Sequence, residues 1–451
     1  MTTTGTLDQI VALTKRRGFV FPSSEIYGGL QATYDYGPLG VELKRLIKDD
    51  WWRSVVRDRE NVVGLDASIL MAARVWEVSG HVAGFNDPLV DCKKCKARFR
   101  ADKMDQAVCP KKPSKKPGEC GGELTEPRQF NAMFRTKVGA VEDDASTIYL
   151  RPETAQGIFV NFKSVMESTR VKIPFGIGQI GKAFRNEIVT GGQLFRMREF
   201  EQMELEFFCA PGTDDEWWEY WKNARLEWWL SLGVRPTHLR MREQDEDERA
   251  HYAKACGDIE YLYPWGWDEV EGVANRTDYD MQAHQEGSGR GLAYRDEEKK
   301  EWVVPYVIEP SAGVDRCFLT LLCDAYEEET KPNGETRTVL HLHPRIAPTQ
   351  IGVFPLVRKD GMPEKARELF ERLRTTYRCF YDQGGTVGRR YSRQDEQGTP
   401  FCVTVDSQTL EDGTVTVRDR DTMAQDRVAP DQLVAFLDDR IRTWSPRTSE
   451  A

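Results

Sequence analysis

The sequence lacks several features, and each absence narrows the class of protein. It has no run of about eighteen apolar residues, so a membrane-spanning helix is not expected. Residues 1–10 lack the basic and then apolar segment of a secretory signal, so we expect a cytoplasmic protein. The net charge is −10, which argues against a protein that coats nucleic acid without specificity. A local basic surface is still compatible with that charge.

What remains has an ordinary globular composition. The chain has 451 residues, of which 39% are hydrophobic, and it is rich in Trp, Tyr and Phe. A chain of this length is too long to fold around a single hydrophobic core, so we expect about two or three domains. Ten cysteines are present, and four of them cluster between positions 92 and 120. In a cytoplasmic protein, such a cluster favours metal binding over disulfides.

The cysteine cluster lies in residues 91–124. Cys92 and Cys95 are two residues apart and form one knuckle, and Cys109 and Cys120, with ten residues between them, form the other. Four thiolates can hold one Zn²⁺ in a closed tetrahedral shell, which indicates a structural site without an open catalytic position. The alternative to zinc is four free thiols. The lysines of the segment allow contact with nucleic acid, and a solvated basic loop is the alternative to that contact.

The most informative stretch runs from residue 181 to residue 208. Bulky apolar residues alternate with charges in two halves, which a loop containing Thr190, Gly191 and Gly192 connects. This pattern predicts an antiparallel hairpin with arginines, aromatics and carboxylates on one face. Arginine binds phosphate, an aromatic ring stacks on a purine, and carboxylates hold an ammonium or a metal ion. The hairpin therefore indicates a site for a nucleotide and a small cation.

A G-x-G-x-x-G match precedes this stretch at residues 176–181. In a dinucleotide-binding fold these glycines open a helix. Here the next residues alternate as in a strand, so we reject that interpretation and place the glycines in tightly packed strand or turn backbone.

Two later stretches carry further charged candidates. Glu269 and Glu271 are two residues apart, so in a strand both would face one side and hold Mg²⁺ or a substrate ammonium. An acidic edge strand is the alternative. Residues 303–323 predict an apolar strand, a tight turn and a buried helix, with Glu309 at the strand end and Arg316 near the helix N-terminus, where anions are favoured. A buried ion pair between Glu309 and Arg316 is the alternative.

Other segments define the organisation of the chain. Thr154, which lies within residues 151–157, is expected to cap the helix that follows it. Thr213 is expected to open a second helix with a capping box, and the tryptophans of that helix are expected to belong to the core. Residues 41–57 form either a helix that packs on its own domain or a dimer helix that uses Trp51 and Trp52. Residues 327–334 look like a polar linker, and alternating strands and helices in residues 341–445 predict a small α/β domain.

Six blocks of the sequence together resemble the dimeric glycyl-tRNA synthetases, a family of class II aminoacyl-tRNA synthetases. The blocks are residues 34–40 (YDYGPLG), 151–157 (RPETAQG), 184–187 (FRNE), 196–200 (RMREF), 309–316 (EPSAGVDR) and 395–400 (DEQGTP). The resemblance implies an α+β fold. Residues 1–335 would form the antiparallel-sheet catalytic domain, with a zinc-ribbon-like insert at 91–124, and residues 341–445 the anticodon-binding domain. The class-wide proline of the dimer strand is not evident at residues 61–65.

The resemblance also implies roles for individual residues. Arg185 would hold the α-phosphate of ATP, Arg316 the terminal phosphates, and Glu269 Mg²⁺ or ATP; these three form the expected catalytic set. The ATP-binding set is Arg185, Asn186, Glu187, Phe195, Phe200, Glu269, Val270, Gly313, Val314, Asp315 and Arg316. The glycine-binding set is Arg100, Glu153, Arg196, Arg198, Glu199, Glu201, Glu204, Glu309, Ser311 and Gly313.

The implied activity is the ATP-dependent attachment of glycine to tRNA(Gly) through a glycyl-adenylate, in a homodimer that uses Mg²⁺. Carboxylates that leave no room for a methyl group would select glycine without an editing domain. Two alternatives differ in class: a synthetase-like adenylating protein that no longer charges tRNA, and a zinc-ribbon regulator that binds nucleic acid.

Overall fold

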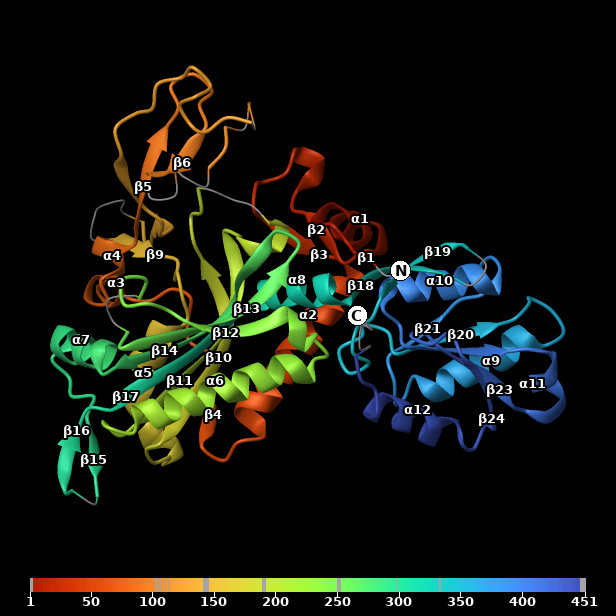
Figure 1. Ribbon diagram of the computed structural model, residues 1–451. Coiled ribbons are helices and arrows are strands. Elements are labelled where there is room, and N and C mark those ends of the chain that lie inside the picture. The colour runs from red at the N-terminus through yellow and green to blue at the C-terminus, as the bar shows by residue number, and fades with distance from the viewer. Residues whose placement is uncertain are drawn as a thin grey trace.

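The computed structural model describes most of the chain (Figure 1). The described residues are 3–101, 104, 107–109, 111–112, 114–140, 146–188, 192–249, 253–297, 299–331 and 334–446. Thr190 and Gly191 of the expected hairpin loop lie outside them. Among the described residues, no helix is both long enough and apolar enough to cross a membrane.

A central sheet organises the first three quarters of the chain. Within the described residues its strand order is β12-β13-β14-β17-β11-β10-β4, and every pairing is antiparallel except that of β4 with β10. The strands are β4 (Val62–Gly64), β10 (Phe175–Phe184), β11 (Glu199–Cys209), β12 (Leu239–Glu243), β13 (Ala255–Tyr263), β14 (Gly266–Thr277) and β17 (Tyr306–Gly313). The predicted hairpin is confirmed as β10 and β11, and the G-x-G-x-x-G glycines lie inside β10.

Helices cover the two faces of this sheet unequally. The helices around it are α1 (Leu7–Arg17), α2 (Pro38–Trp52), α5 (Ala155–Thr169), α6 (Asp214–Ser231), α7 (Tyr279–Ser288) and α8 (Val314–Ala325). On β11, Phe207 contacts the α6 rings of Trp217 and Trp221, whereas Phe208 contacts Phe162 of α5. Because neighbouring strand residues point to opposite faces, α6 and α5 lie on opposite sides of the sheet. The α5 side leaves part of the sheet open, and the site lies there.

Two expectations about these helices need correction. Thr213 forms no capping box: its backbone already has helical angles, and its hydroxyl donates to the carbonyl of Ala210. Thr154 does precede α5, but its hydroxyl bonds Glu204 and does not cap the helix. Trp51 is fully buried in the core of its own domain, so the helix of residues 41–57 uses this side chain for internal packing.

The remaining N-terminal elements surround the sheet. They are β1 (Thr3–Thr4), β2 (Val20–Pro22), β3 (Tyr34–Tyr36), the single-turn helix η1 (Glu25–Tyr27), the π-helical turn η2 (Arg53–Arg57), α3 (Ala73–Val78), α4 (His81–Gly84), β8 (Arg135–Lys137), β9 (Thr147–Tyr149), the turns η5 (Gln193–Phe195) and η6 (Pro236–His238), β15 (Tyr294–Asp296) and β16 (Glu301–Val303). The cysteine segment projects from the body (Figure 1) beside a small sheet of β5 (Asn86–Asp91), β6 (Arg98–Arg100) and β7 (Arg128–Asn131).

The C-terminal part is an α/β unit with its own hydrophobic core. Its described sheet has the order β21-β20-β22-β23-β24 and is flanked by helices. The elements are β20 (Ile351–Pro355), α9 (Met362–Leu373), β21 (Cys379–Tyr381), α10 (Val387–Gln397), β22 (Phe401–Val405), α11 (Ser407–Asp412), β23 (Val415–Asp419), β24 (Gln425–Val428) and α12 (Leu433–Arg442).

The expected linker at residues 327–334 is largely a hairpin. Strand β18 (Tyr326–Thr330) pairs with β19 (Thr336–Leu340), and β1 joins them. The charges that suggested a linker are paired: Glu329 bonds Arg337 at 2.7 Å, and Arg337 reaches Asp395 of α10 at 3.0 Å. The segment is therefore a charged, ordered junction to the C-terminal unit.

Candidate active site

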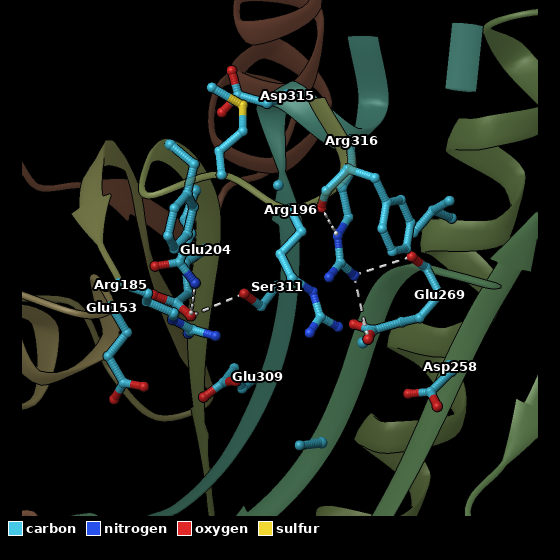
Figure 2. A pocket seen from close by; sticks show the side chains of 18 of the residues that line it. Glu153, Arg185, Arg196, Glu204, Asp258, Glu269, Glu309, Ser311, Asp315 and Arg316 are labelled. Carbon is cyan, nitrogen blue, oxygen red and sulfur yellow. Dashed lines mark hydrogen bonds and ion pairs between the residues drawn. The ribbon is translucent and has the colours of Figure 1, made fainter. Parts of the chain in front are cut away.

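A cleft of about 570 Å³ opens on the face of the sheet that α5 and α7 cover only in part. Its walls come from β11, β14 and β17 and from the connection between β10 and β11 (Figure 2). Strands that are distant in sequence are adjacent here, because β17 pairs with both β11 and β14. The cleft thus collects side chains from three separate blocks of the sequence.

Strand alternation decides which residues of β11 reach the cleft. Phe200, Gln202 and Glu204 line it. Glu199 and Glu201 point to the other face, where Glu199 pairs with Lys182, and Glu201 pairs with Lys44 at 2.7 Å and Lys48 at 3.0 Å. Arg198, outside the cleft as well, donates to the carbonyls of Glu187 and Gln31 at 3.1 and 2.9 Å. The structure therefore does not bring Arg198, Glu199 and Glu201 into the cleft.

Acidic groups form one end of the cleft. Glu204 is 2% exposed and accepts hydrogen bonds from Thr154 and, at 2.9 Å, from Ser311. Across the strand pair, Glu309 accepts from Arg276 at 2.5 Å, and Arg276 also bonds Asp280 at 2.8 Å. Burial raises the pKa of Glu309 and of Glu204, whereas the charge of Arg276 lowers the pKa of Glu309. These groups favour the arrival of a cation.

Glu153 completes this end from the turn before α5. Its carboxylate lies 3.2 Å from the Nε2 atom of His81, a residue of α4. Burial alone would raise the pKa of Glu153, but His81 and then Arg276 outweigh burial and lower it below its usual range. Glu153 is therefore ionised, and the cleft holds at least one fixed negative charge.

Arginines and aromatic rings form the other end. The Arg185 guanidinium lies 5.4 Å from the ring centre of Phe200. Arg316 lies 4.3 Å from the ring centre of Phe195, bonds its carbonyl at 3.2 Å, and pairs with Glu269 at 3.3 Å. The Arg196 side chain extends into the space between the two ends (Figure 2). This end has the groups that phosphates and a purine require.

Strand β17 places Arg316 by running directly into α8. Gly313 is the N-cap of α8, and Arg316 lies in its first turn. The helix N-terminus carries partial positive charge, which adds to that of the guanidinium. Asp315 borders the cleft, but its carboxylate accepts from Tyr36, from Lys44 at 2.9 Å and from the Glu201 amide at 2.8 Å. Asp315 thereby fixes the start of α8 against β11.

A β-bulge separates Glu269 from Glu271, so the expectation that both face one side is wrong. Ile259 pairs with Glu271 and Glu260 with Glu269, which leaves Val270 as an extra residue on β14. Glu269 lines the cleft. Glu271 points to the α6 face and is fully buried there, bonded to Arg225 at 2.5 Å and Trp229 at 2.7 Å.

The remaining sequence candidates divide by position. Those that also line the cleft are Arg100, Glu187, Val270 and Gly313. Asn186 and Val314 do not line the cleft. The backbone N–H of Asn186 donates to the carbonyl of Ala132, and Val314 is buried in the core. The alternative of an ion pair between Glu309 and Arg316 is not what the structure has, since Glu309 pairs with Arg276 and Arg316 with Glu269.

Several residues of the site escaped the sequence reasoning. Arg276 and Asp280 follow the Glu269 stretch, yet only the pairing of β14 with β17 brings Arg276 to Glu309. His81 has no motif of its own. Asp258 lines the cleft from β13, and burial raises its pKa to about 6. Period-two alternation with Glu260 is the only sequence signal for Asp258.

The four clustered cysteines lie close together outside the cleft. The ligand atoms of Cys92, Cys95 and Cys120 lie within 4.8 Å of one another, and the Cys92 and Cys120 sulfurs are 3.6 Å apart. Cys109 belongs to the same buried cluster. Backbone hydrogen bonding at Cys95 lowers the pKa of the Cys92 thiol to about 7. A donor set of soft sulfurs with thiolate character fits Zn²⁺.

Comparison with known proteins identifies two matched regions and close relatives. Residues 134–326 match the model of the tRNA synthetase class II core domain (G, H, P, S and T), and residues 350–440 match the anticodon binding domain. The chain is 52% identical to the glycine–tRNA ligase of Treponema denticola, over 97% of this chain and 98% of the relative. It is equally identical to the glycine–tRNA ligases of Thermobifida fusca and Acetivibrio thermocellus, over 96% of this chain and 98% of each relative.

Proposed function

Because this chain belongs to the glycine–tRNA ligases, a family of class II aminoacyl-tRNA synthetases, we propose that the cleft is where it activates glycine for transfer to tRNA(Gly). The single observation that carries the assignment is the division of the cleft. Arg185, Phe200 and Arg316 gather at one end, and Glu204 and Glu309 at the other. A nucleotide triphosphate and an amino acid that react with each other need such adjoining subsites.

ATP would bind at the arginine end. Arg185 would hold the α-phosphate, Arg316 the terminal phosphates, and Phe200 would stack on the adenine, whose amino group would bond Glu187. The positions of Arg185, just after β10, and Arg316, in the first turn of α8, support this assignment, because guanidinium groups that reach the phosphates from two elements can stabilise the charge that develops during transfer. Glu269 and Asp258 would hold Mg²⁺, which would neutralise phosphate charge.

Glycine would bind at the acidic end. Its ammonium would meet Glu204, Glu309 and Glu153, with Ser311 nearby, and Arg196 would hold its carboxylate. The carboxylate would attack the α-phosphorus and give glycyl-adenylate and pyrophosphate. The terminal ribose hydroxyl of tRNA would then attack the activated carbonyl. Since no protein nucleophile takes part, rate acceleration would come from positioning and charge stabilisation.

Selection of glycine would depend on exclusion. The acids occupy the space around the ammonium, and a methyl group on the substrate would meet them. In an apolar pocket, one extra methyl group changes the binding free energy only modestly. Forced desolvation of buried charges costs more free energy than that.

We propose that residues 1–335 form the catalytic domain, with an insert at 91–124, and that residues 341–445 bind the anticodon. The separate core of the C-terminal unit supports this division. We also propose a structural Zn²⁺ on the four cysteines, a cytoplasmic location and a homodimer. The dimer proposal rests on the family resemblance, and light scattering of the purified protein tests it.

Glycine-dependent ATP–pyrophosphate exchange, followed by charging of tRNA(Gly), tests the assignment. We expect both reactions in the wild type, and loss of exchange in R185A and R316A with the melting temperature preserved. Exchange without charging would indicate an adenylating protein, and the absence of exchange would favour a nucleic-acid-binding regulator. R389A is the matched control for the exchange reaction alone, because Arg389 is exposed on α10 in the unit proposed to bind the anticodon, and exchange does not use tRNA.

A further inference from the structure

Glu206 is a buried carboxyl group that the proposed reaction does not use. It lies two residues beyond Glu204 on β11 and is 0% exposed. Neither of its oxygens accepts a hydrogen bond from any residue in the described part of the chain. Two other carboxyl groups lie close to it, since oxygens of Glu204, Glu206 and Glu309 lie within 4.8 Å of one another. A buried polar group without a donor requires a physical explanation.

Strand register brings Glu206 and Glu309 together. In the pairing of β11 with β17, Glu204 is opposite Ser311 and Phe207 is opposite Ile308. The same register puts Glu206 directly opposite Glu309. Like charges at directly opposite positions destabilise a strand pair, and burial removes the water that would screen them. Ionising Glu206 and Glu309 at the same time would therefore cost much free energy.

The charges around Glu206 do not compensate for a negative charge on it. The ionisable groups that face it are Glu204 on its own strand, Glu309 on β17, Arg276 on β14 and Asp280 on α7. Arg276 is the one cation among them, and it already bonds Glu309 and Asp280. Burial, and next the charge of Glu309, raises the pKa of Glu206 well above its usual range.

A neutral carboxyl group still needs an acceptor for its proton. Oxygens of Glu309 and Glu204 lie nearby as possible acceptors, and Thr154 and Ser311 already donate to Glu204. We propose that Glu206 is a neutral carboxylic acid whose O–H donates to the carboxylate of Glu309, and that it thereby positions Glu309 for the ammonium of glycine. This inference rests on the proposed function of the cleft. Glu206 does not line the cleft, so it is a positioning residue that acts through Glu309.

The consequence for specificity follows from the two partners of Glu309. Arg276 bonds one oxygen of Glu309, and Glu206 would donate to the same carboxylate. The orientation of the Glu309 carboxylate would therefore be fixed before glycine arrives. A fixed carboxylate can both bind the ammonium and exclude a larger amino acid. A cation held by three ionised carboxylates is the competing explanation, and the variants below separate the two.

The test uses two substitutions of similar size. Gln in E206Q is always neutral and keeps an N–H donor, whereas Met in E206M has neither charge nor donor. We expect E206Q to keep the KM for glycine within about 3-fold of wild type, and E206M to raise it about 10- to 100-fold, as loss of a hydrogen bond to a charged group does. The KM for ATP should change little in both. A merely structural role would not give this split between two substrates.

Infrared spectroscopy gives a second measurement, which does not depend on whether E206M folds. The wild-type spectrum should contain the carbonyl band of a protonated carboxyl group, and E206Q should lack it. Equal loss of glycine affinity in E206Q and E206M, an unchanged KM in E206M, or the absence of the band would each overturn the proposal. E204Q tests the cleft itself: if it left the KM for glycine unchanged, the ammonium site would be wrong whatever Glu206 does.

Discussion

Glu269 and Glu271 allow a sharp test, because they are two residues apart and the bulge at Val270 separates their roles. Glu271 is fully buried, and its carboxylate bonds Arg225 and Trp229 at 2.5 and 2.7 Å. In E271Q the Arg225 charge loses its counter-ion inside the core. Breaking a buried ion pair costs about 3–5 kcal/mol. At about 2 °C per kcal/mol for a large domain, the melting temperature should fall by about 6–10 °C.

E269Q should behave in the opposite way. The Glu269 side chain is 47% exposed, so its loss should change the free energy of unfolding by less than about 0.5 kcal/mol. It orients Arg316, however, and loss of a group that orients a functional side chain lowers activity by about 10- to 100-fold. Each variant is therefore the control for the other.

The assay combines thermal unfolding with glycine-dependent ATP–pyrophosphate exchange below both melting temperatures. E271Q should exchange within about 3-fold of wild type while it remains folded. The reasoning would be refuted if E271Q lost exchange at an unchanged melting temperature. It would also be refuted if E269Q destabilised the fold. That result would mean that Glu269 lies on the same buried face as Glu271, as simple alternation predicts.

Three further predictions concern other parts of the molecule. Elemental analysis should find about one zinc per chain, lost in a C92S/C95S variant, and a folded, metal-free native protein would contradict this. Burial lowers the pKa of His81, but Glu153 outweighs burial and the net pKa is raised. His81 therefore stabilises the fold fully below its unfolded pKa of about 6.5, and this stability is lost as pH rises through the folded pKa. Because the pKa of Glu153 is lowered, its contribution is present above about pH 4.3. Wild type should thus exceed H81N in unfolding free energy most between about pH 4.5 and 6.5, and a pH-independent difference would count against the pair. Asp395 bonds Arg418 at 2.8 and 2.9 Å and Arg337 at 3.0 Å, so D395N should destabilise the junction by about 3–5 kcal/mol and lower tRNA charging more than exchange; equal loss of both would argue against it.

Short motifs contain several of the residues that line the two ends of the cleft. Arg185 and Phe200 belong to one hairpin, and Glu309, Ser311 and Arg316 to one strand–helix junction, so local sequence fixes their relative positions. That the chain would bring the two blocks together followed from the family resemblance. Pairing of β11 with β17 is the physical cause, and no local pattern specifies it.

Alternation along β11 indicates which of its carboxylates face the cleft. If Glu204 faces the cleft, a period of two sends Glu199 and Glu201 to the other face, where lysines pair with them. The same rule failed for Glu271, because one extra residue in β14 reverses the phase. A bulge depends on the partner strand, so the sequence of β14 alone does not reveal it.

The acidic end of the cleft shows why the missed residues matter more than the predicted ones for its charge. Glu153, Glu204 and Glu309 were all expected, yet three carboxylates alone would repel one another in a buried site. His81 offsets the first, two hydroxyl donors hold the second, and Arg276 offsets the third. Thr154 and Ser311 lie in the sequence blocks, but His81 and Arg276 belong to no motif, since each is useful only where the fold brings it beside an acid. Tertiary contacts therefore decide whether such carboxylates form a cation-binding site or an unstable acidic cluster. The sequence marks the carboxylates, but it does not mark every partner that balances their charge.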